Sequence, residues 1–425
     1  MKARLSTGAK VLAGILALVG ACAAGVGWLN VRGEGPVADA MPTQAPRAES
    51  VQRGAYLARA GNCAACHTER GGEPFAGGKG ITTPFGTVFP GNITPDAETG
   101  IGQWSPDHFW RAMHHGRSRD GRLLYPAFPY PEYTRVTRED SDALYAFLQS
   151  QPAVRRANRP HDLRFPYDSQ PALAVWRALF FSPGTFAPDR TQSAEWNRGA
   201  YLVQGLGHCQ ACHAPRNAFG ATRDGLALGG GLIPMQQWYA PSLATPGEAG
   251  VQGWPARDVV RLLKDGTSEG GTAMGPMAEV IAGSTQHLTE ADLHAMATYL
   301  RSLPEQQHAT PRGADVPLDV MQLGGRIFKA RCAECHGERG EGDAHGYPPL
   351  AGHRTVTMPS SVNLVKVIMS GGFPATTPGH PRPSGMPPFG HVLSDAEIAA
   401  VASYVRRTWG NDAPGVTAFD VNRLR

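Results

Sequence analysis

The pattern Cys-x-x-Cys-His occurs three times in this chain of 425 residues and limits what the chain can fold into more than any other feature. It takes up six of the seven cysteines, as the pairs Cys63 and Cys66, Cys209 and Cys212, and Cys332 and Cys335. Two cysteines separated by two residues can form thioethers with the two vinyl groups of one porphyrin, which holds the following histidine under the ring. We therefore predict three covalently bound haem c groups, with His67, His213 and His336 as iron ligands.

Two other chemistries use a Cys-x-x-Cys pair. A structural zinc site needs four closed ligands, usually from two such pairs. A thioredoxin-like redox pair lies within a βαβ pattern, and the sequence around these motifs has no such pattern. Neither chemistry explains why a histidine follows immediately in all three copies, whereas haem attachment does.

The three motifs belong to an internal repeat. Each follows a short segment with a glycine and an aromatic residue: Arg53-Gly54-Ala55-Tyr56-Leu57, Arg198-Gly199-Ala200-Tyr201-Leu202, or Gly325-Arg326-Ile327-Phe328. Each precedes a second helical signal, which begins at Thr137, Thr289 or Ser394 with an acidic residue three positions later, as in a capping box or its Asp variant. We expect the first helix to pack closely against the second.

This organisation predicts an all-α chain with three tandem helical domains. The predicted segments are a signal or membrane anchor at 1–35, domains at 50–155, 195–305 and 318–412, linkers at 156–194 and 306–317, and a tail at 413–425. The first linker contains several prolines around one amphipathic run from Ala172 to Phe181. A linker of this length either packs against another subunit or a neighbouring domain, or is a simple spacer.

A sixth iron ligand in an electron carrier is commonly methionine, which raises the reduction potential. We expect it on a loop before the last helix of each domain. Met386 lies there in the third domain, and Met277 in the second, with Met274 as a weaker rival. The alternative role for a methionine is to fill the core.

The first domain departs from this pattern, because Phe128 occupies the matching loop and a phenylalanine cannot bind iron. Met113 is the methionine between Cys66 and the last helix of this domain, with His108, His114 and His115 nearby. The first iron therefore binds Met113, which we favour, or a histidine, or stays five-coordinate. The plain interpretation of the three histidines is that they are exposed.

The ring N–H of each iron-binding histidine needs an acceptor that fixes its orientation. Pro90, Pro241 and Pro349 each lie in a loop after the motif. We expect a backbone carbonyl at these positions to accept the hydrogen bond.

The N-terminus has basic residues before an uncharged stretch from Val11 to Leu29. Nineteen helical residues would span roughly 28 Å, close to the thickness of the hydrocarbon core of a bilayer. The segment is an uncleaved anchor, a secretory signal cleaved near Ala38-Asp39-Ala40, or a lipoprotein signal acylated at Cys22. All three place the residues after Arg32 outside the cytoplasm.

Charge and composition exclude some functions. With 40 Lys and Arg against 36 Asp and Glu, the chain has no case for binding nucleic acid. The sequence also has no flavin or pterin fingerprint and no catalytic triad or carboxylate pair. We predict no catalytic residues.

The chain resembles the membrane-bound tri-haem cytochrome c subunits of bacterial alcohol, gluconate and aldehyde dehydrogenase complexes. The matching stretches include Pro90-Gly-Asn-Ile-Thr-Pro95, His114-His-Gly116, Arg119-Asp-Gly121 and Gly385-Met-Pro-Pro-Phe-Gly390. The resemblance implies three class I cytochrome c domains, with Met277 and Met386 as axial ligands and a methionine where this chain has Phe128. That departure, with Trp176-Arg-Ala-Leu-Phe-Phe181, looks more like the branch that serves molybdenum hydroxylases.

The leading hypothesis is therefore an electron-transfer subunit on the periplasmic side of the cytoplasmic membrane. It would pass electrons from a dehydrogenase subunit, with a small iron–sulfur subunit as a further possible partner, to ubiquinone or a terminal oxidase. One alternative is the cytochrome subunit of a quinoprotein alcohol or flavoprotein gluconate dehydrogenase. Others are a peroxidase-like enzyme with an open first haem and His114 or His115 as acid and base, and a module of a terminal oxidase.

Overall fold

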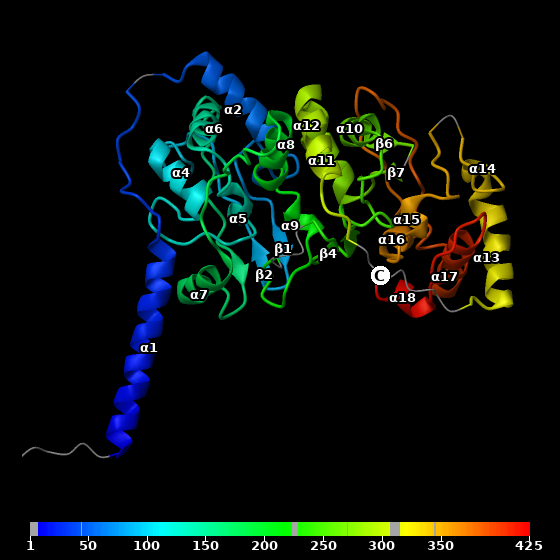
Figure 1. The fold of residues 1–425 in the computed structure, drawn as a ribbon, viewed down its shortest axis with the longest axis horizontal. Helices are drawn as coiled ribbons and strands as arrows, with labels where there is room; N and C mark the ends of the chain where they lie inside the picture. Colours follow the sequence, from blue (N-terminus) through cyan, green and yellow to red (C-terminus); the bar gives the residue numbers. More distant parts are fainter. Residues whose placement is uncertain (1–6, 44, 223–227, 270, 307–314, 344–345) are drawn as a thin grey trace, which may run out of the picture. The chain divides into compact units, whose positions relative to one another are not determined.

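The computed structural model describes residues 7–43, 45–222, 228–269, 271–306, 315–343 and 346–425 (Figure 1). The chain folds as two compact units. The first comprises Met1–Gly54 and His67–Phe186, and the second Ala55–Cys66 and Ala187–Arg425. The three predicted domains remain a prediction. Most of the predicted linker at 306–317 lies outside the described residues, as do the first six residues of the predicted anchor.

The first unit contains one long helix and several short ones. The helices are α1 (Thr7–Val31), α4 (Pro106–His115), α5 (Tyr130–Tyr133), α6 (Arg138–Gln149) and α7 (Gln170–Phe180). The strands β1 (Ile81–Thr83), β2 (Gly86–Val88) and β3 (Asp162–Leu163) form an antiparallel sheet in that order. Helices α2 (Ala48–Ala60) and α3 (Cys63–His67) contribute residues to both units.

The second unit contains two copies of a similar helical arrangement. Its helices are α8 (Ala194–Gln204), α9 (Gln210–His213), α10 (Ala256–Asp265), α11 (Pro276–Gly283), η1 (Thr285–His287), α12 (Glu290–Arg301), α13 (Leu318–Arg331), α14 (Ala333–His336), α15 (Arg354–Thr357), α16 (Val362–Ser370), α17 (Asp395–Arg407) and α18 (Ala418–Asn422). Two hairpins accompany them: β4 (Gly231–Ile233) with β5 (Trp238–Ala240), and β6 (Thr267–Ser268) with β7 (Gly271–Thr272). An all-α chain is therefore not confirmed, although helices dominate.

The expected close packing of first and last helices occurs three times, each time at a glycine. A Cβ atom at Gly54 would clash with the backbone carbonyl of Ala143, one at Gly199 with that of Ala295, and one at Gly324 with that of Ala400. The sequence pattern had pointed to Gly325 in the third copy. The residue against the backbone is Gly324 instead, because a Cβ at Gly325 would face only the Tyr404 ring at 3.1 Å.

The predicted starts of the last helices are confirmed. The side chains of Thr137, Thr289 and Ser394 each accept a hydrogen bond from the backbone N–H three residues later. The reciprocal bond of a capping box forms in the third copy, from the backbone N–H of Ser394 to the Glu397 carboxylate.

In the first two copies the acidic residue instead pairs with an arginine of the first helix. Asp140 accepts a hydrogen bond of 2.7 Å from Arg53 Nε. Asp292 accepts bonds of 2.8 and 2.7 Å from Arg198. These acids therefore join two helices in addition to occupying the first turn of one.

A buried arginine braces α17, the last helix of the third copy of the repeat. Arg406 on α17 is 0% exposed. Its guanidinium donates to the backbone carbonyls of Pro414 at 2.6 Å, Val356 at 2.8 Å and Pro359 at 3.2 Å. Burial lowers the pKa of Arg406 to about 10. The side chain thereby ties the end of α15 and the irregular segments at Pro359 and Pro414 to one helix.

Candidate haem centres

The three Cys-x-x-Cys-His segments adopt similar short helices. They lie in α3, in α9 with Cys209 as the preceding residue, and in α14 with Cys332 as the preceding residue. Burial raises the pKa of the Cys63 and Cys209 thiols to about 12 and that of Cys332 to about 11. The first cysteine of each motif is partly buried, and the low polarity around its sulfur favours the neutral thiol over the thiolate.

Each motif histidine is oriented by a backbone carbonyl. The Nδ1 atom of His67 lies 2.8 Å from the oxygen of Gly91, that of His213 2.7 Å from Pro241, and that of His336 3.0 Å from Pro348. The predicted acceptor is right at Pro241. It is one residue off elsewhere, since Gly91 and Pro348 replace the neighbouring Pro90 and Pro349.

Burial lowers the pKa of all three histidines, although the carbonyl partners act in the opposite direction. The neutral imidazole is therefore favoured near neutral pH. A neutral ring that donates from Nδ1 has its lone pair on Nε2, which is the atom a metal binds. The protein thus presents three histidines in the tautomer that an iron ligand needs.

Met277 lies in the first turn of α11. Its side chain packs against a small buried cluster of Ala273, Ala278, Ile281 and Ala375. The residue before this turn is Gly275, with φ of 57° and a Cβ position 2.8 Å from the Trp238 ring. A glycine is needed there because the backbone is left-handed and the indole leaves no room for a side chain.

Met386 lies in an extended segment that is bridged to Gly372. The two residues exchange backbone hydrogen bonds of 2.9 Å in both directions. The Met386 side chain packs against the main core of this part of the unit, which includes Phe328, Ile368 and Val401. Its backbone position is therefore fixed from both sides.

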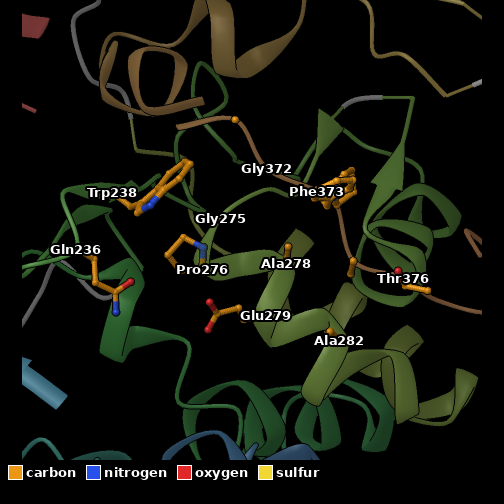
Figure 2. Close-up of a pocket in the computed structure, with 13 residues that line it drawn as sticks. Gln236, Trp238, Gly275, Pro276, Ala278, Glu279, Ala282, Gly372, Phe373 and Thr376 are labelled. Carbon is orange, nitrogen blue, oxygen red and sulfur yellow. The ribbon is translucent and has the colours of Figure 1, made fainter. Parts of the chain in front are cut away.

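One open cavity, of about 690 Å³, borders both methionine segments (Figure 2). Gly275 and Pro276, which precede Met277, form part of its lining. Gly371 and Gly372, which hold the Met386 segment, form another part. Figure 2 shows Trp238 and Phe373 on opposite sides of this cavity, with Glu279 between them on α11.

The candidate sixth ligands of the first iron lie in different surroundings. Met113 is buried on α4, at 6% exposure. The plain interpretation of exposed histidines is wrong, since all three are buried. His108 is occupied at the start of α4, where Nδ1 lies 2.9 Å from Ser105 Oγ and Nε2 3.2 Å from Asp39. Phe128 packs against the rings of Tyr130 and Tyr133. Met113 stays a prediction.

His114 and His115 have different surroundings. The His114 ring stacks on Trp110 at 4.3 Å between centroids, and its Nδ1 lies 3.4 Å from Thr134 Oγ1. Burial lowers the pKa of both histidines to about 4. Both are therefore neutral at physiological pH.

Two residues of the third copy, the partly buried His353 and the buried Arg406, were not singled out from the sequence. Desolvation, and to a smaller extent the charge of the nearby His336, lowers the pKa of His353 to about 4. Arg406 carries the three carbonyl contacts described above. The sequence offered one signal for Arg406, namely a basic residue within the apolar spacing of α17.

The donor set fits haem c. Partly buried cysteine pairs, neutral histidines with oriented rings and methionines on fixed segments together are the groups that hold a covalently bound haem. The fit between these residues and haem c follows from their positions in the folded chain.

Comparisons with known proteins agree with this chemistry. The family model described as cytochrome c matches residues 51–152 and 321–409. The cytochrome c subunit of the quinone-dependent alcohol dehydrogenase of Gluconacetobacter polyoxogenes is 40% identical over 90% of this chain and 86% of its own length. The gluconate 2-dehydrogenase cytochrome c subunit of Pantoea cypripedii is 38% identical over 88% of this chain and 89% of its own.

A third relative is larger. A subunit of the nicotinate dehydrogenase of Pseudomonas putida is 41% identical over 86% of this chain, but the match covers 31% of that protein. With these similarities over nearly the whole chain, the protein belongs to the family of cytochrome c subunits of bacterial alcohol, gluconate, fructose and nicotinate dehydrogenases.

Proposed function

We propose that this chain holds three haem c groups and relays electrons from a periplasmic dehydrogenase subunit to ubiquinone or a terminal oxidase. The observation that carries this proposal is the threefold recurrence of one arrangement. In each copy a partly buried cysteine pair precedes a histidine whose Nδ1 lies within 3.0 Å of a backbone carbonyl. Such repetition is what a chain of similar redox centres requires.

Each bound haem supplies an iron that changes oxidation state by one electron. The cysteines would hold the porphyrin, and His67, His213 and His336 would each present Nε2 to the iron. Met277 and Met386 would each supply a thioether sulfur as a further iron ligand. A thioether ligand raises the potential of an iron centre, which suits delivery to an acceptor such as a quinone or an oxidase.

The second and third centres have a direct structural connection within the second unit. The segment after Gly372 places Ala375 in the same buried cluster that contacts Met277. The same Gly372 is hydrogen-bonded to Met386. The two proposed sulfur ligands are therefore joined by a short run of packed chain, which supports electron transfer between their irons.

The partner is proposed from the sequence of the first copy. Phe128, where a methionine is usual, and the Trp176–Phe181 segment favour a molybdenum hydroxylase, with a small iron–sulfur subunit as an intermediate carrier. A quinoprotein alcohol dehydrogenase or a flavoprotein gluconate dehydrogenase is the alternative. The relatives include subunits of alcohol, gluconate and nicotinate dehydrogenases, which supports the general role.

The N-terminal helix is proposed as a retained anchor. Helix α1 has 25 residues with a mean hydropathy of 2.1 over its most apolar window, and none of that window is buried. The segment that follows is bound to the folded protein. Glu34 pairs with Arg117 at 2.9 Å, and the backbone N–H of Ala38 donates to Asp107 at 3.0 Å.

These contacts argue against cleavage near Ala38-Asp39-Ala40. Ser105 Oγ donates to the carbonyl of Ala38 at 2.5 Å, so both backbone groups of this residue are engaged. Cleavage near Ala38-Asp39-Ala40 would take away Glu34 and leave Arg117 without its carboxylate. Retention places the folded units on the periplasmic side of the membrane.

The experiment is purification of the tagged chain in mild detergent, with three measurements on the same sample. Haem content by alkaline pyridine spectroscopy should give three haems per chain, and intact mass should include residue 1 or 2. Mass spectrometry of co-purifying proteins should find a molybdopterin or iron–sulfur subunit. A quinoprotein or flavoprotein would move the partner to the alternative branch. A chain that purifies alone, with fewer than three haems, would refute the relay.

A further inference from the structure

We infer that α7 lies in the membrane interface, as a second attachment element beside the end of α1. This inference rests on the proposed anchor. Figure 1 shows α7 across the end of α1 from which the chain enters the first unit. The partner is the headgroup region of a phospholipid bilayer.

Polar contacts fix α7 against the last turn of α1. Asn30 is 7% exposed, and its Nδ2 donates to the Ala174 carbonyl of α7 at 2.8 Å. Its Oδ1 accepts from Arg177 Nε at 2.9 Å. Two residues later, Arg32 donates to the Phe181 carbonyl at 3.2 Å. Asn30 directly follows the uncharged stretch of α1, so these contacts mark the level at which α1 leaves the hydrocarbon.

The charge on α7 is turned away from the exposed side. Its 11 residues read QPALAVWRALF, in which Arg177 is the charged member. That guanidinium is 3% exposed and also donates to the carbonyl of His115 at 2.5 Å. The helix therefore presents an outer face with no charge, held from behind by its own arginine.

The outer face is apolar and open. Val175 is 47% exposed and Leu179, one turn further on, is 67% exposed. Trp176 and Phe180 are half-buried, with ring centroids 5.7 Å apart. Phe165, in the turn before the helix, is 83% exposed. Large apolar residues gathered in this way mark a surface that is normally covered.

The end of α1 indicates which surface covers the outer face of α7. Trp28 is 64% exposed in the last turn of α1. Tryptophan is enriched where a membrane protein crosses from hydrocarbon to headgroups, because its ring is apolar and its N–H is polar. An anchored Trp28 lies at that depth, and the contacts of Asn30 keep α7 beside it. A short amphipathic helix at this level buries its apolar face among the headgroups.

The test uses the full haem-loaded chain in nanodiscs of phosphatidylethanolamine and phosphatidylglycerol that contain a phospholipid with a photoreactive diazirine near its carbonyl groups. After illumination, peptide mass spectrometry locates the lipid adducts. We expect adducts on α1 and on the peptide that contains Val175 and Leu179. The α6 segment around Glu139, whose side chain is 78% exposed, is the internal control and should carry none.

A variant sharpens the result. Val175→Glu/Leu179→Glu should reduce the adducts on α7 on the order of tenfold while those on α1 remain. The haem spectrum of the variant checks that it folds. The single variant Leu179→Glu covers the case in which the double variant fails to fold.

The outcomes separate the two proposals. Adducts on α1 with none on α7 would overturn the interfacial helix and keep the anchor. A chain that begins after residue 38 and carries no adducts would overturn the anchor itself. Adducts on α7 that disappear when the co-purified dehydrogenase subunit is bound would overturn the lipid partner in favour of a protein one.

Discussion

Replacement of Gly199 by alanine tests the helix crossing on which the repeated fold depends. Gly199 on α8 faces the backbone of α12, and a Cβ there would lie far inside 3.0 Å of the Ala295 carbonyl, closer than real Cβ atoms come. The obstacle is main chain and cannot rotate away. The two helices must therefore move apart along their contact.

The size of the effect follows from two opposing contributions. Overpacking of a well-packed contact costs about 1–3 kcal/mol, and more when the neighbour is rigid. Replacement of glycine by alanine within a helix stabilises the helix by about 1 kcal/mol. Because the clash at Gly199 is with backbone, the upper part of the range applies. We expect a net loss of about 1–2 kcal/mol.

Hydrogen exchange followed by mass spectrometry is the suitable assay, because a chain with several units does not unfold in one step. Protection of the α8 and α12 amides should fall by roughly 5- to 30-fold, since each 1.4 kcal/mol is a factor of ten. Gly247→Ala is the matched control, because nothing lies within 4 Å of its Cβ position. Equal protection in the two variants would refute the crossing argument.

Three further substitutions test the rest of the description. Met386→Leu should lower one reduction potential without loss of haem, and a redox titration with unchanged midpoints would exclude this ligand. Arg406→Leu should lower the stability of α17 in hydrogen exchange by about 3–5 kcal/mol, because three carbonyls lose their buried donor; a loss below about 1 kcal/mol would show that the site relaxes. Burial opposes ionisation of Asp292, but hydrogen bonds from Arg198 and Tyr56 outweigh it and hold its pKa below the usual value. Its contribution to stability is therefore present at neutral pH and lost as pH falls below about 4. Asp292→Asn should be less stable than the wild type at pH 7, and the difference should shrink in acid; a gap that does not depend on pH would rule out the ion pair.

Local sequence predicted the helices well because their signals are local. Thr137, Thr289 and Ser394 were found as helix starts because a capping hydroxyl acts on a backbone N–H three residues away. The amphipathic run of the first linker was found for the same reason and became α7. The short strands were not found, because each has two or three residues and a two-residue period needs a longer run to be visible.

Contacts between distant segments could not be predicted in this way. The acid at the third position of a helix looked like half of a capping box, yet Asp140 and Asp292 bind arginines of another helix. The same local pattern is satisfied in two ways, and only the position of the first helix decides between them. The choice of Gly324 over Gly325 has the same origin, since which of two adjacent glycines faces the partner depends on helix rotation.

The segments of Met277 and Met386 are a further case in which a contact between distant segments was not predicted, and this contact bears on function. Sequence position suggested Met277 and Met386 one at a time, each as the methionine on a loop before a last helix. The structure adds that Ala375, from the loop that leads to Met386, is 4% exposed and packs in the cluster beside Met277. A change that enlarges this residue would press on α11, so the environment of one proposed sulfur ligand depends on a loop that belongs to the other. The two proposed redox centres of the second unit are thus coupled through packing, which no inspection of either motif by itself could show.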